Sequence, residues 1–435
     1  MTLRRVLVIT YYWPPSGGSG VQRWLKFAKY LPTHGWQPVV VTPTNPDFPV
    51  TDESLLEEIP VEVEMLRYPI REPYAWYRKL TGAKPGENFG AAPVQSPGLL
   101  KRIAIWIRGN FFIPDPRVAW VKPTSSQLIK YLKDQPVDAV VSTGPPHSVH
   151  LIGQAIKEAF PDVPWILDVR DPWSQFDVHL SFNPGKRARA KNARMEREAL
   201  AKADVVLGTS YSMPTHLEPF DLAKFRTITN GYDESDFPEV STTQQQDQFH
   251  LYHTGLLNAV RNPIAVWRAL ARLVRQDAGF AERLHIHLIG TVAPEVITAL
   301  EGYSELKGKW TITPWIDHQK LVQRYKNADA FLLCPNVSDN ARGQINGKLF
   351  EYLAARRPVL HIGPWDSDNT RILDQAHAGL TVPPGDVDAS VYVIRELANG
   401  AFAKTPHAFN DDEIGRYSRE ATAGELAVLL DGLSS

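Results

Sequence analysis

The sequence predicts an α/β protein built from two tandem Rossmann-like domains that face a central cleft. Strand-like runs alternate with helical patterns through both halves of the chain, and a polar stretch interrupts this alternation near the middle. The length of 435 residues agrees with two domains, because it exceeds what one hydrophobic core usually organises.

Seven strands are expected before the polar stretch. They are VLVIT (6–10), PVVVT (38–42), VEVEMLRY (61–68), DAVVSTG (138–144), WILDVRD (165–171), DVVLGT (204–209) and FRTITNG (225–231). Helical periodicity lies between most of them, over 21–33, 122–134, 148–159 and 185–202. This alternation is typical of βαβ units and of a parallel, doubly wound sheet.

The polar stretch STTQQQDQ, residues 241–248, is interpreted as an inter-domain linker. Further strands are expected at FHLYHTG (249–255), LHIHLIG (284–290), KWTITPW (309–315), DAFLLCP (329–335) and PVLHIG (358–363). We therefore expect an N-terminal domain over residues 1–240 and a C-terminal domain over 249–415. A helix within 416–435 is expected to pack back on the first domain. Ligands of such sheets bind beyond the carboxyl ends of the strands.

Charge and composition exclude several functions. The formal net charge of −1 gives a polyanion no long-range attraction, so nucleic acid is not expected as the main ligand. The charge is uneven, with a net +4 over residues 1–235 and −5 after them. Cys334 is the single cysteine, which rules out an internal disulfide or a Cys-based metal cluster. No run approaches the ~18 apolar residues of a membrane span, so we expect a cytoplasmic protein.

Two basic segments leave alternatives open. In LLKRIAIWIRGNFF, residues 99–112, the side chains of Leu100, Ile103, Ile107 and Phe111 lie roughly on one helical face. This helix either packs on its own domain or lies in the interface of an anionic membrane. The basic helix GKRARAKNARMERE, residues 185–198, is either a solvated face or a surface for anionic lipid or a lipid-linked acceptor.

The loop YYWPPSGGSG, residues 11–20, leads from the first strand into a helix, whose free backbone N–H groups favour an anion. It does not match the dinucleotide motif G-x-G-x-x-G, because Arg23 stands at the third glycine position. The second strand also lacks an acid at its end, so NAD is not expected. A sugar-linked diphosphate is the better candidate, and a simple tight βα turn is the other interpretation.

A matching pattern occurs in the C-terminal half. In GQINGKLFEYLAARRPVLHIG, Gly347 precedes a short helix that carries Lys348 and Glu351. Amides at this helix start could hold a diphosphate, and Glu351 could accept the two ribose hydroxyls. Arg261, after the first strand of this domain, could neutralise phosphate charge. The alternatives are a solvated helix acid and a surface arginine.

Together the motifs YYWPPSGGSGVQRW, PPHSVH, DVRDPW, TNGYD, HTGLLNAVRNP and GKLFEYLAARRPVL resemble retaining glycosyltransferases of the GT-B fold, family 4. The resemblance implies a UDP- or GDP-linked sugar donor held mainly by the C-terminal domain, with no further cofactor. It also implies a saccharide or lipid-linked acceptor held mainly by the N-terminal domain, in cell-surface polysaccharide or glycolipid synthesis. The donor contacts that it implies are Gly17, Gly18, Ser19, Gly20, Arg261, Gly347, Lys348 and Glu351.

The same resemblance implies that His147 orients the donor sugar and that Arg261 and Lys348 act in catalysis, with the leaving diphosphate accepting the acceptor's proton. Asp171 and Arg170 either bind acceptor hydroxyls or form a structural pair. The first Glu of the family's E-x7-E motif would fall at Gly343 and is absent. Hydrogen-bonding groups that could substitute for it are Asp339, Asn340, Gln344 and Asn346.

The motifs quoted above contain no Asp-x-Asp, so we expect catalysis without a divalent metal. Two other functions stay open. A nucleotide-sugar epimerase of the same fold would convert the donor alone. A non-catalytic GT-B-like protein, suggested by Gly343, would bind a nucleotide or partner without turnover.

Overall fold

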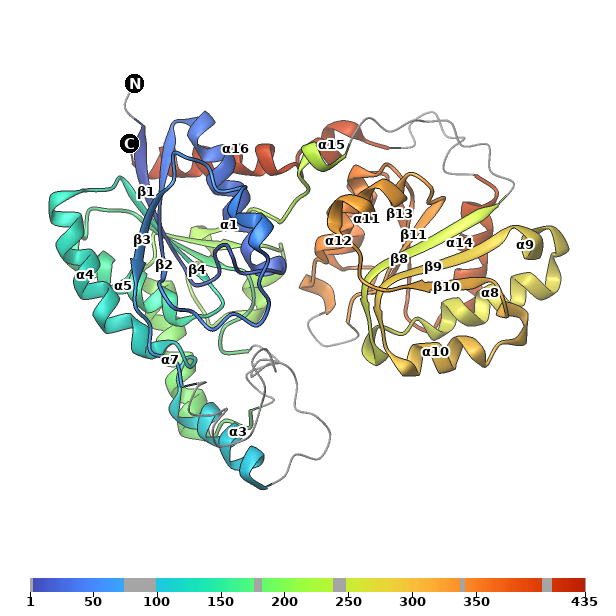
Figure 1. Cartoon of the computed structure of the whole chain (residues 1–435), viewed down its shortest axis with the longest axis horizontal. Helices are drawn as coiled ribbons and strands as arrows, with labels where there is room; N and C mark the ends of the chain where they lie inside the picture. The colour runs from blue at the N-terminus through green and yellow to red at the C-terminus, as the bar shows by residue number, and fades with distance from the viewer. Residues whose placement is uncertain are drawn as a thin grey trace. The chain divides into compact units, whose positions relative to one another are not determined.

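The computed structural model describes residues 3–73, 99–175, 182–237, 248–336, 341–400 and 409–434. Its contacts divide the chain into unit 1, Met1–Thr229 with Thr422–Ser435, and unit 2, Asn230–Ala421 (Figure 1). The division falls at Thr229, earlier than the domain end that we placed at residue 240. Most of the predicted linker, 241–247, lies outside the described residues, as do Asp339 and Asn340.

Unit 1 contains one seven-stranded parallel sheet in the order β3-β2-β1-β4-β5-β6-β7. Its strands are β1 (Arg4–Thr10), β2 (Trp36–Pro43), β3 (Glu64–Tyr68), β4 (Ala139–Gly144), β5 (Trp165–Val169), β6 (Val205–Gly208) and β7 (Phe225–Thr227). In the centre of the sheet, Val8 is in register with Val40 and Val141. All seven strands expected from the sequence are therefore present.

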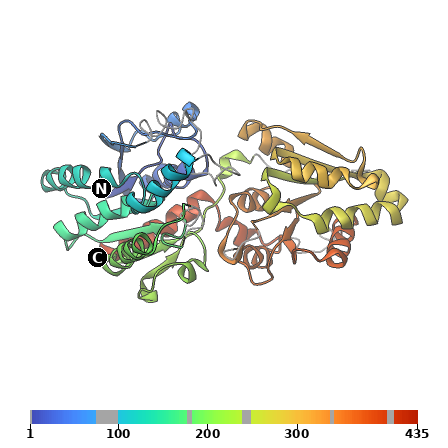
Figure 2. The same ribbon diagram turned by 90° about the horizontal axis from the view of Figure 1, so that it is seen from below.

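Helices cover both faces of this sheet (Figures 1 and 2). They are α1 (Ser19–Tyr30), α4 (Val121–Asp134), α5 (Ser148–Ala159), α7 (Lys186–Lys202) and α16 (Arg419–Leu433), while α3 (Leu99–Phe111) packs against α7 away from the sheet. Because side chains alternate along a strand, Leu7 and Ile9 pack in the core under α4, α5 and α7, whereas Val6 and Val8 pack under α1 and α16. The last helix, α16, thus completes the core of the first unit.

Unit 2 contains a six-stranded parallel sheet in the order β10-β9-β8-β11-β12-β13. Its strands are β8 (Phe249–Leu257), β9 (Leu284–Val292), β10 (Trp310–Thr313), β11 (Ala330–Leu333), β12 (Val359–Ile362) and β13 (Gly379–Val382). The strand β13 was not predicted. The two sheets confirm the α/β class with two Rossmann-like domains.

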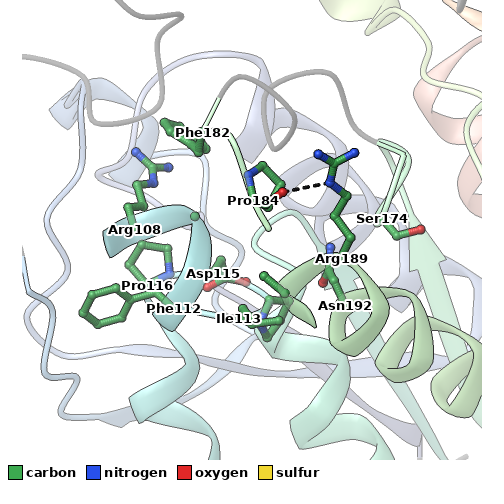
Figure 3. Close-up of a pocket in the computed structure, with 13 residues that line it drawn as sticks. Arg108, Phe112, Ile113, Asp115, Pro116, Ser174, Phe182, Pro184, Arg189 and Asn192 are labelled. Atoms are coloured by element: carbon green, nitrogen blue, oxygen red, sulfur yellow. Dashed lines mark hydrogen bonds between the residues drawn. The ribbon is translucent and has the colours of Figure 1, made fainter. Parts of the chain in front are cut away.

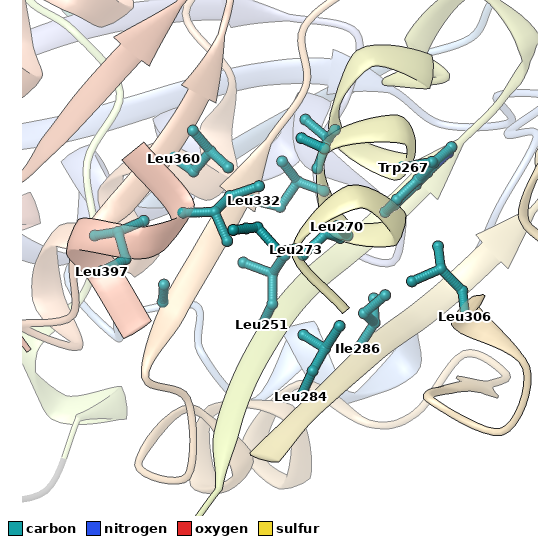
Figure 4. Close-up of a cluster of buried hydrophobic side chains, with 14 of the residues drawn as sticks. Leu251, Trp267, Leu270, Leu273, Leu284, Ile286, Leu306, Leu332, Leu360 and Leu397 are labelled. Carbon is teal, nitrogen blue, oxygen red and sulfur yellow. The ribbon is translucent and has the colours of Figure 1, made fainter. Parts of the chain in front are cut away.

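The helices of unit 2 are α8 (Ile264–Gln276), α9 (Ala278–Arg283), α10 (Pro294–Glu301), α11 (His318–Tyr325), α12 (Gly347–Ala354), α13 (Asp368–Gln375), α14 (Val387–Ala398) and α15 (Asp411–Gly415). The main core lies between the sheet and the helices α8, α10 and α14. There Leu251, Ile286 and Leu332 of the strands meet Trp267 and Leu270 of α8 (Figure 4). None of the helices in the described ranges combines the length and apolarity needed to cross a bilayer.

Candidate functional site

The carboxyl edge of the unit 2 sheet holds a pocket. The chain order reverses between β8 and β11, and in doubly wound sheets such a switch point is the usual ligand site. A pocket of about 160 Å³ opens there, lined by residues that follow the ends of β8, β11, β12 and β13. Two guanidinium groups, Arg261 and the exposed Arg268 of α8, line it together with Pro335, Ile362 and Pro384. The pocket therefore combines apolar walls with positive charge, which suits a phosphorylated ligand.

Arg261 is held in place by its neighbours. Its Nε donates to Asn336 Oδ1 at 2.6 Å, and one terminal nitrogen donates to the carbonyl of Leu256 at 3.4 Å. The backbone N–H of Asn336 in turn donates to Gln344 Oε1 at 3.1 Å. Partial burial lowers the pKa of Arg261. A cation that is oriented in advance and partly desolvated interacts strongly with an anion.

The start of α12 lies beyond the end of β11, at the same edge of the sheet. Gly347 is exposed at the first position of this helix, and Asn346 makes no side-chain cap there, so backbone amides are open to an anion. Lys348 Nζ lies 2.9 and 3.1 Å from the two oxygens of Glu351. The hydroxyl of Tyr325 donates to Glu351 Oε2 at 2.7 Å. Both charged side chains remain partly accessible, at 30% for Lys348 and 19% for Glu351.

His318 joins this group, although the sequence analysis did not select it. It begins α11, and its Nε2 lies 3.3 Å from Asp236 Oδ2. The hydrogen bond to Asp236 raises the pKa of His318, and the charge of Glu351 also raises it. No motif marks His318, because its neighbours come from residues more than thirty positions away on either side. The site in unit 2 is therefore a mixed-charge cluster of His318, Lys348 and Glu351 beside the Arg261 pocket.

In unit 1, the glycine loop is fixed by backbone bonds. The N–H of Gly17 donates to the carbonyl of Val50 at 2.9 Å, and the N–H of Asp52 donates to that of Pro15 at 2.8 Å. Gly18 precedes α1 with φ +84°, a conformation that favours glycine, and makes no side-chain cap. The side chain of Ser19 lies outside what the structure describes. The amides at the start of α1 thus follow the carboxyl end of β1, as expected for an anion site.

Arg170 ties three loops together. Its guanidinium and Nε donate to the backbone carbonyls of Gly20, Gly144 (3.0 Å) and Pro145 (2.7 Å). These carbonyls belong to the start of α1 and to the loop after β4, while Arg170 itself follows β5. The contacts engage the guanidinium in the fold, and they support the structural role that was one of our two expectations for Arg170. The acceptor contact of Arg170 stays a prediction. Its neighbour Asp171 is half-buried, and burial raises the pKa of its carboxyl.

His147 precedes α5 and is fully buried. Its ring stacks on that of Trp173, with centroids 5.2 Å apart and planes within 6°. The neighbouring His150 is equally buried, and burial lowers its pKa to about 3. In this conformation His147 offers no surface to a ligand. The sugar contact that the family resemblance implied for it therefore requires the ring to move away from Trp173.

Asp115 also supports this loop, and it was missed at the sequence level. Its carboxylate accepts hydrogen bonds from the N–H of Ser148 (2.7 Å), the hydroxyl of Ser148 (2.9 Å) and the N–H of Arg117 (2.8 Å). It thereby caps the start of α5, next to His147. Asp115 also lines a second pocket, of about 40 Å³, together with Arg108 and Arg189 (Figure 3). The segment PDP after α3 is the only sequence signal, and it does not reveal a partner 33 positions away.

The predicted site residues thus form two groups. In unit 1 the glycine loop, His147 and Arg170 follow the ends of the adjacent strands β1, β4 and β5. In unit 2, Arg261 follows β8, and Gly347, Lys348 and Glu351 lie on the helix after β11. Within the described ranges, no three His, Cys, Asp or Glu side chains form a group that could hold a metal ion.

Comparisons with known proteins agree with this architecture. No family model matches the sequence, and no curated protein sequence matches it either. Sucrose-phosphate synthase from Thermosynechococcus elongatus is similar over 99% of both chains, with 15% identity and a TM-score of 0.63. HepE of Anabaena in complex with UDP-glucose matches at 13% identity and TM-score 0.56, over 99% of this chain and 100% of that one. The lipopolysaccharide outer core galactosyltransferase WaaB matches at 13% identity and TM-score 0.58, over 98% and 99%.

These likenesses, at such low identity, concern the fold. The chain has the two-domain GT-B fold that these glycosyltransferases share. What the site does is argued from its residues.

Proposed function

We propose that this protein is a retaining, family 4-type glycosyltransferase. It would transfer a sugar from a UDP- or GDP-linked donor to a hydroxyl of a saccharide or lipid-linked acceptor in cell-surface polysaccharide or glycolipid synthesis. One observation carries the proposal: Arg261 and the open start of α12, with Lys348 and Glu351, lie at the switch point of the unit 2 sheet. HepE, of the same fold, was crystallised with UDP-glucose, which supports a donor of this class.

Each donor contact follows from the chemistry of the group. Arg261 and the amides at Gly347 would neutralise the diphosphate. Glu351 would accept the ribose hydroxyls. Its carboxylate already accepts hydrogen bonds from Tyr325 and Lys348, so the ribose would bind to a carboxylate whose position is set in advance. Lys348, bound to Glu351 at present, would turn its charge toward the phosphates when the nucleotide enters.

The chemical step would depend on electrostatic stabilisation. As the sugar–phosphate bond breaks, negative charge grows on the leaving diphosphate, and Arg261, Lys348 and the amides at Gly347 would stabilise it. The diphosphate itself would take the proton of the acceptor hydroxyl, which then forms the new glycosidic bond on the same face of the sugar. This course requires neither a protein base nor a cofactor, and we propose that it proceeds without a divalent metal. Loss of activity in chelator, restored by manganese, would contradict the metal-free step.

Unit 1 would hold the acceptor. The glycine loop and the half-buried Asp171 offer amides and a carboxylate for acceptor hydroxyls, while Arg170 keeps the surrounding loops in place. His147 would orient the donor sugar after its ring leaves Trp173. We place the reaction in the cytoplasm, at the inner face of the membrane where a lipid-linked acceptor is found.

A thermal-shift titration tests the donor site first. A ligand that binds only the folded state, at a hundredfold excess over its Kd, stabilises by about 2.7 kcal/mol. We expect a shift with UDP or GDP, none with NAD, and loss of the shift in Glu351→Ala. Glu295→Ala, which removes an exposed acid on α10, is the matched control and should keep the shift. No shift with any nucleotide would contradict the donor site and favour a non-catalytic protein that binds a partner.

The reaction itself is tested with the sugar conjugate of the nucleotide that binds. Release of nucleoside diphosphate that depends on added acceptor, with the donor's anomeric configuration kept in the product by NMR, is the expected result. Conversion of the donor to an epimer without acceptor would identify the epimerase alternative instead.

A further inference from the structure

The two basic segments of the sequence lie together in the structure. The C-terminal part of α3 packs against the start of α7, at an end of unit 1 that projects from the sheet (Figure 1). Asn110 joins them: its Oδ1 accepts from the N–H of Gly185 at 2.8 Å, and its Nδ2 donates to the carbonyl of Trp106 at 2.8 Å. We call their exposed side chains the α3–α7 surface, namely Arg102, Ile103, Trp106, Phe111, Lys186, Arg187, Lys191 and Arg194.

The α3 part of this surface exposes large apolar groups. Ile103 is 47% exposed, Trp106 51% and Phe111 68%. The rings of Trp106 and Phe111 contact each other, with centroids 5.7 Å apart. Three large apolar side chains within nine positions of one helix are unusual on a surface that faces only water. Tryptophan beside aliphatic and basic residues is typical of helices that lie in a membrane interface.

The α7 part supplies positive charge. This helix carries seven Lys and Arg against two Glu, in a chain whose net charge is −1. One of the two, Glu196, is buried, and the other, Glu198, pairs with Arg194 at 3.7 Å. In the described part of the chain, Lys186, Arg187 and Lys191 are exposed and have no acidic partner. The charge excess is therefore concentrated on one helix.

The pocket between the two helices extends this charge. Arg108 comes from α3 and Arg189 from α7, and both line it (Figure 3). The guanidinium of Arg108 lies 3.9 Å from the ring centroid of Phe182, and Nε of Arg189 donates to the carbonyl of Pro184 at 2.8 Å. Both cations are thus held by neighbouring groups where they line the pocket, and a phosphate that enters it could contact them.

We propose that the α3–α7 surface docks unit 1 on a membrane with anionic lipids. Ile103, Trp106 and Phe111 would enter the interface between headgroups and acyl chains, and the basic side chains would contact lipid phosphates. The proposal rests on the proposed function in one respect, the purpose of docking, which is to bring the enzyme to a lipid-linked acceptor. Docking itself needs neither donor nor acceptor, so it is measured without them.

Vesicle co-sedimentation of the full chain tests the docking. We expect binding to vesicles of equal parts phosphatidylglycerol and phosphatidylcholine at low salt, and at least tenfold weaker binding to phosphatidylcholine alone. Because each basic residue near an anionic surface contributes ~1 kcal/mol, the triple change Lys186→Gln, Arg187→Gln, Lys191→Gln should weaken binding about a hundredfold. Trp106→Ser should weaken it about tenfold while leaving the charge unchanged.

Two matched controls make the result specific. The triple change Lys122→Gln, Lys130→Gln, Lys133→Gln removes the same charge from exposed positions of α4 and should leave binding unchanged. Trp365→Ser removes an exposed tryptophan of unit 2 and should also have no effect. The proposal is overturned if anionic vesicles do not sediment the protein, or if either control weakens binding as much as its counterpart. Retention on heparin through Lys186, Arg187 and Lys191 without vesicle binding would assign the surface to a soluble polyanion and also overturn it.

Discussion

A charged residue at a strand end can either stabilise the surrounding loops or bind a ligand. Arg261, Lys348 and Glu351 could be selected from the sequence, because glycine and charge follow apolar strand runs there. Arg170 could be selected too, but its three carbonyl partners come from other loops, and only the structure shows that they engage it. Asp115 and His318 escaped selection for the same reason, since their roles come from tertiary contacts.

A buried ion pair in unit 1 gives a prediction about stability. Asp168 on β5 is fully buried and accepts from Arg23 (3.1 Å) and from Trp24 Nε1 (2.7 Å), while Arg23 also donates to the carbonyl of Thr229. Burial pushes the pKa of Asp168 upward, but Arg23 and Trp24 outweigh it and hold the pKa below its usual value. Asp168→Asn should cost about 3–5 kcal/mol in urea unfolding, because it leaves Arg23 buried without its counter-charge.

The control for this prediction is Glu198→Gln, which breaks the exposed pair with Arg194. That change should cost less than about 1 kcal/mol. Equal effects of the two substitutions would show that the buried pair contributes no more to the free energy of unfolding than the exposed pair.

His147 gives a prediction about turnover. If its ring leaves Trp173 to orient the donor sugar, His147→Ala should lower kcat by at least a hundredfold, with little change in the nucleotide-induced thermal shift. His150→Ala removes an equally buried imidazole that bonds Ser142 and should mainly lower the melting temperature. Steady-state kinetics on both variants decides, and a kcat near that of the unmodified protein in His147→Ala would remove this residue from the mechanism.

Among the secondary-structure elements, strands could be predicted wherever a run of β-branched residues is long enough to be distinguished from a loop. The strand β13, Gly379–Val382, was not predicted, because four residues between a helix end and two prolines carry too short a pattern. The amphipathic pattern of α3 was predicted, but the sequence could not show that Ile103 and Phe111 stay exposed or that α3 packs against α7. The periodicity of apolar residues identifies the apolar face of a helix. What that face packs against depends on the rest of the chain.

Three histidines on β8 and β9 predict acid sensitivity of unit 2. His250 Nδ1 lies 2.9 Å from His287 Nε2, and the rings of His285 and His287 are 4.5 Å apart. Burial, together with the charges of the other two histidines, lowers the pKa of His287 to about 3. In the unfolded chain His287 binds a proton below about pH 6.5, whereas in the folded protein it does so only near pH 3. The free energy of unfolding is therefore highest above pH 6.5 and decreases as the pH falls toward 3.

The measurement is the melting temperature between pH 7.5 and 4.5. His287→Gln should reduce the slope, because it removes one of the histidines that take up a proton on unfolding. Buried histidines such as His150 and His253, whose pKa values burial also lowers, should keep the rest of the slope. His377→Gln, which removes a histidine outside this cluster, is the matched control and should keep the slope. An unchanged slope in His287→Gln would contradict the prediction.

At the scale of the whole molecule, α16 gives a prediction about which unit depends on it. Leu426 and Leu430 are fully buried in the core of unit 1, and Asp431 binds Arg4 and Trp36 of the same unit. Leu426→Ala should cost about 2–5 kcal/mol. Hydrogen exchange should accelerate in β1 and β2 but not in β8 and β9, and equal acceleration in both units would show that α16 does not belong to unit 1 alone.

The return of α16 to unit 1 also affects how the protein forms during synthesis. About 190 residues separate Thr229 from Thr422, and a ribosome adds roughly 5–20 residues each second. For about 10–40 s, while unit 2 is being made, the nascent first unit would therefore present the sheet face beneath α16 without its covering helix. The half of the chain that is made first is thus completed last, and a chaperone that shields apolar surface would act mainly on that face.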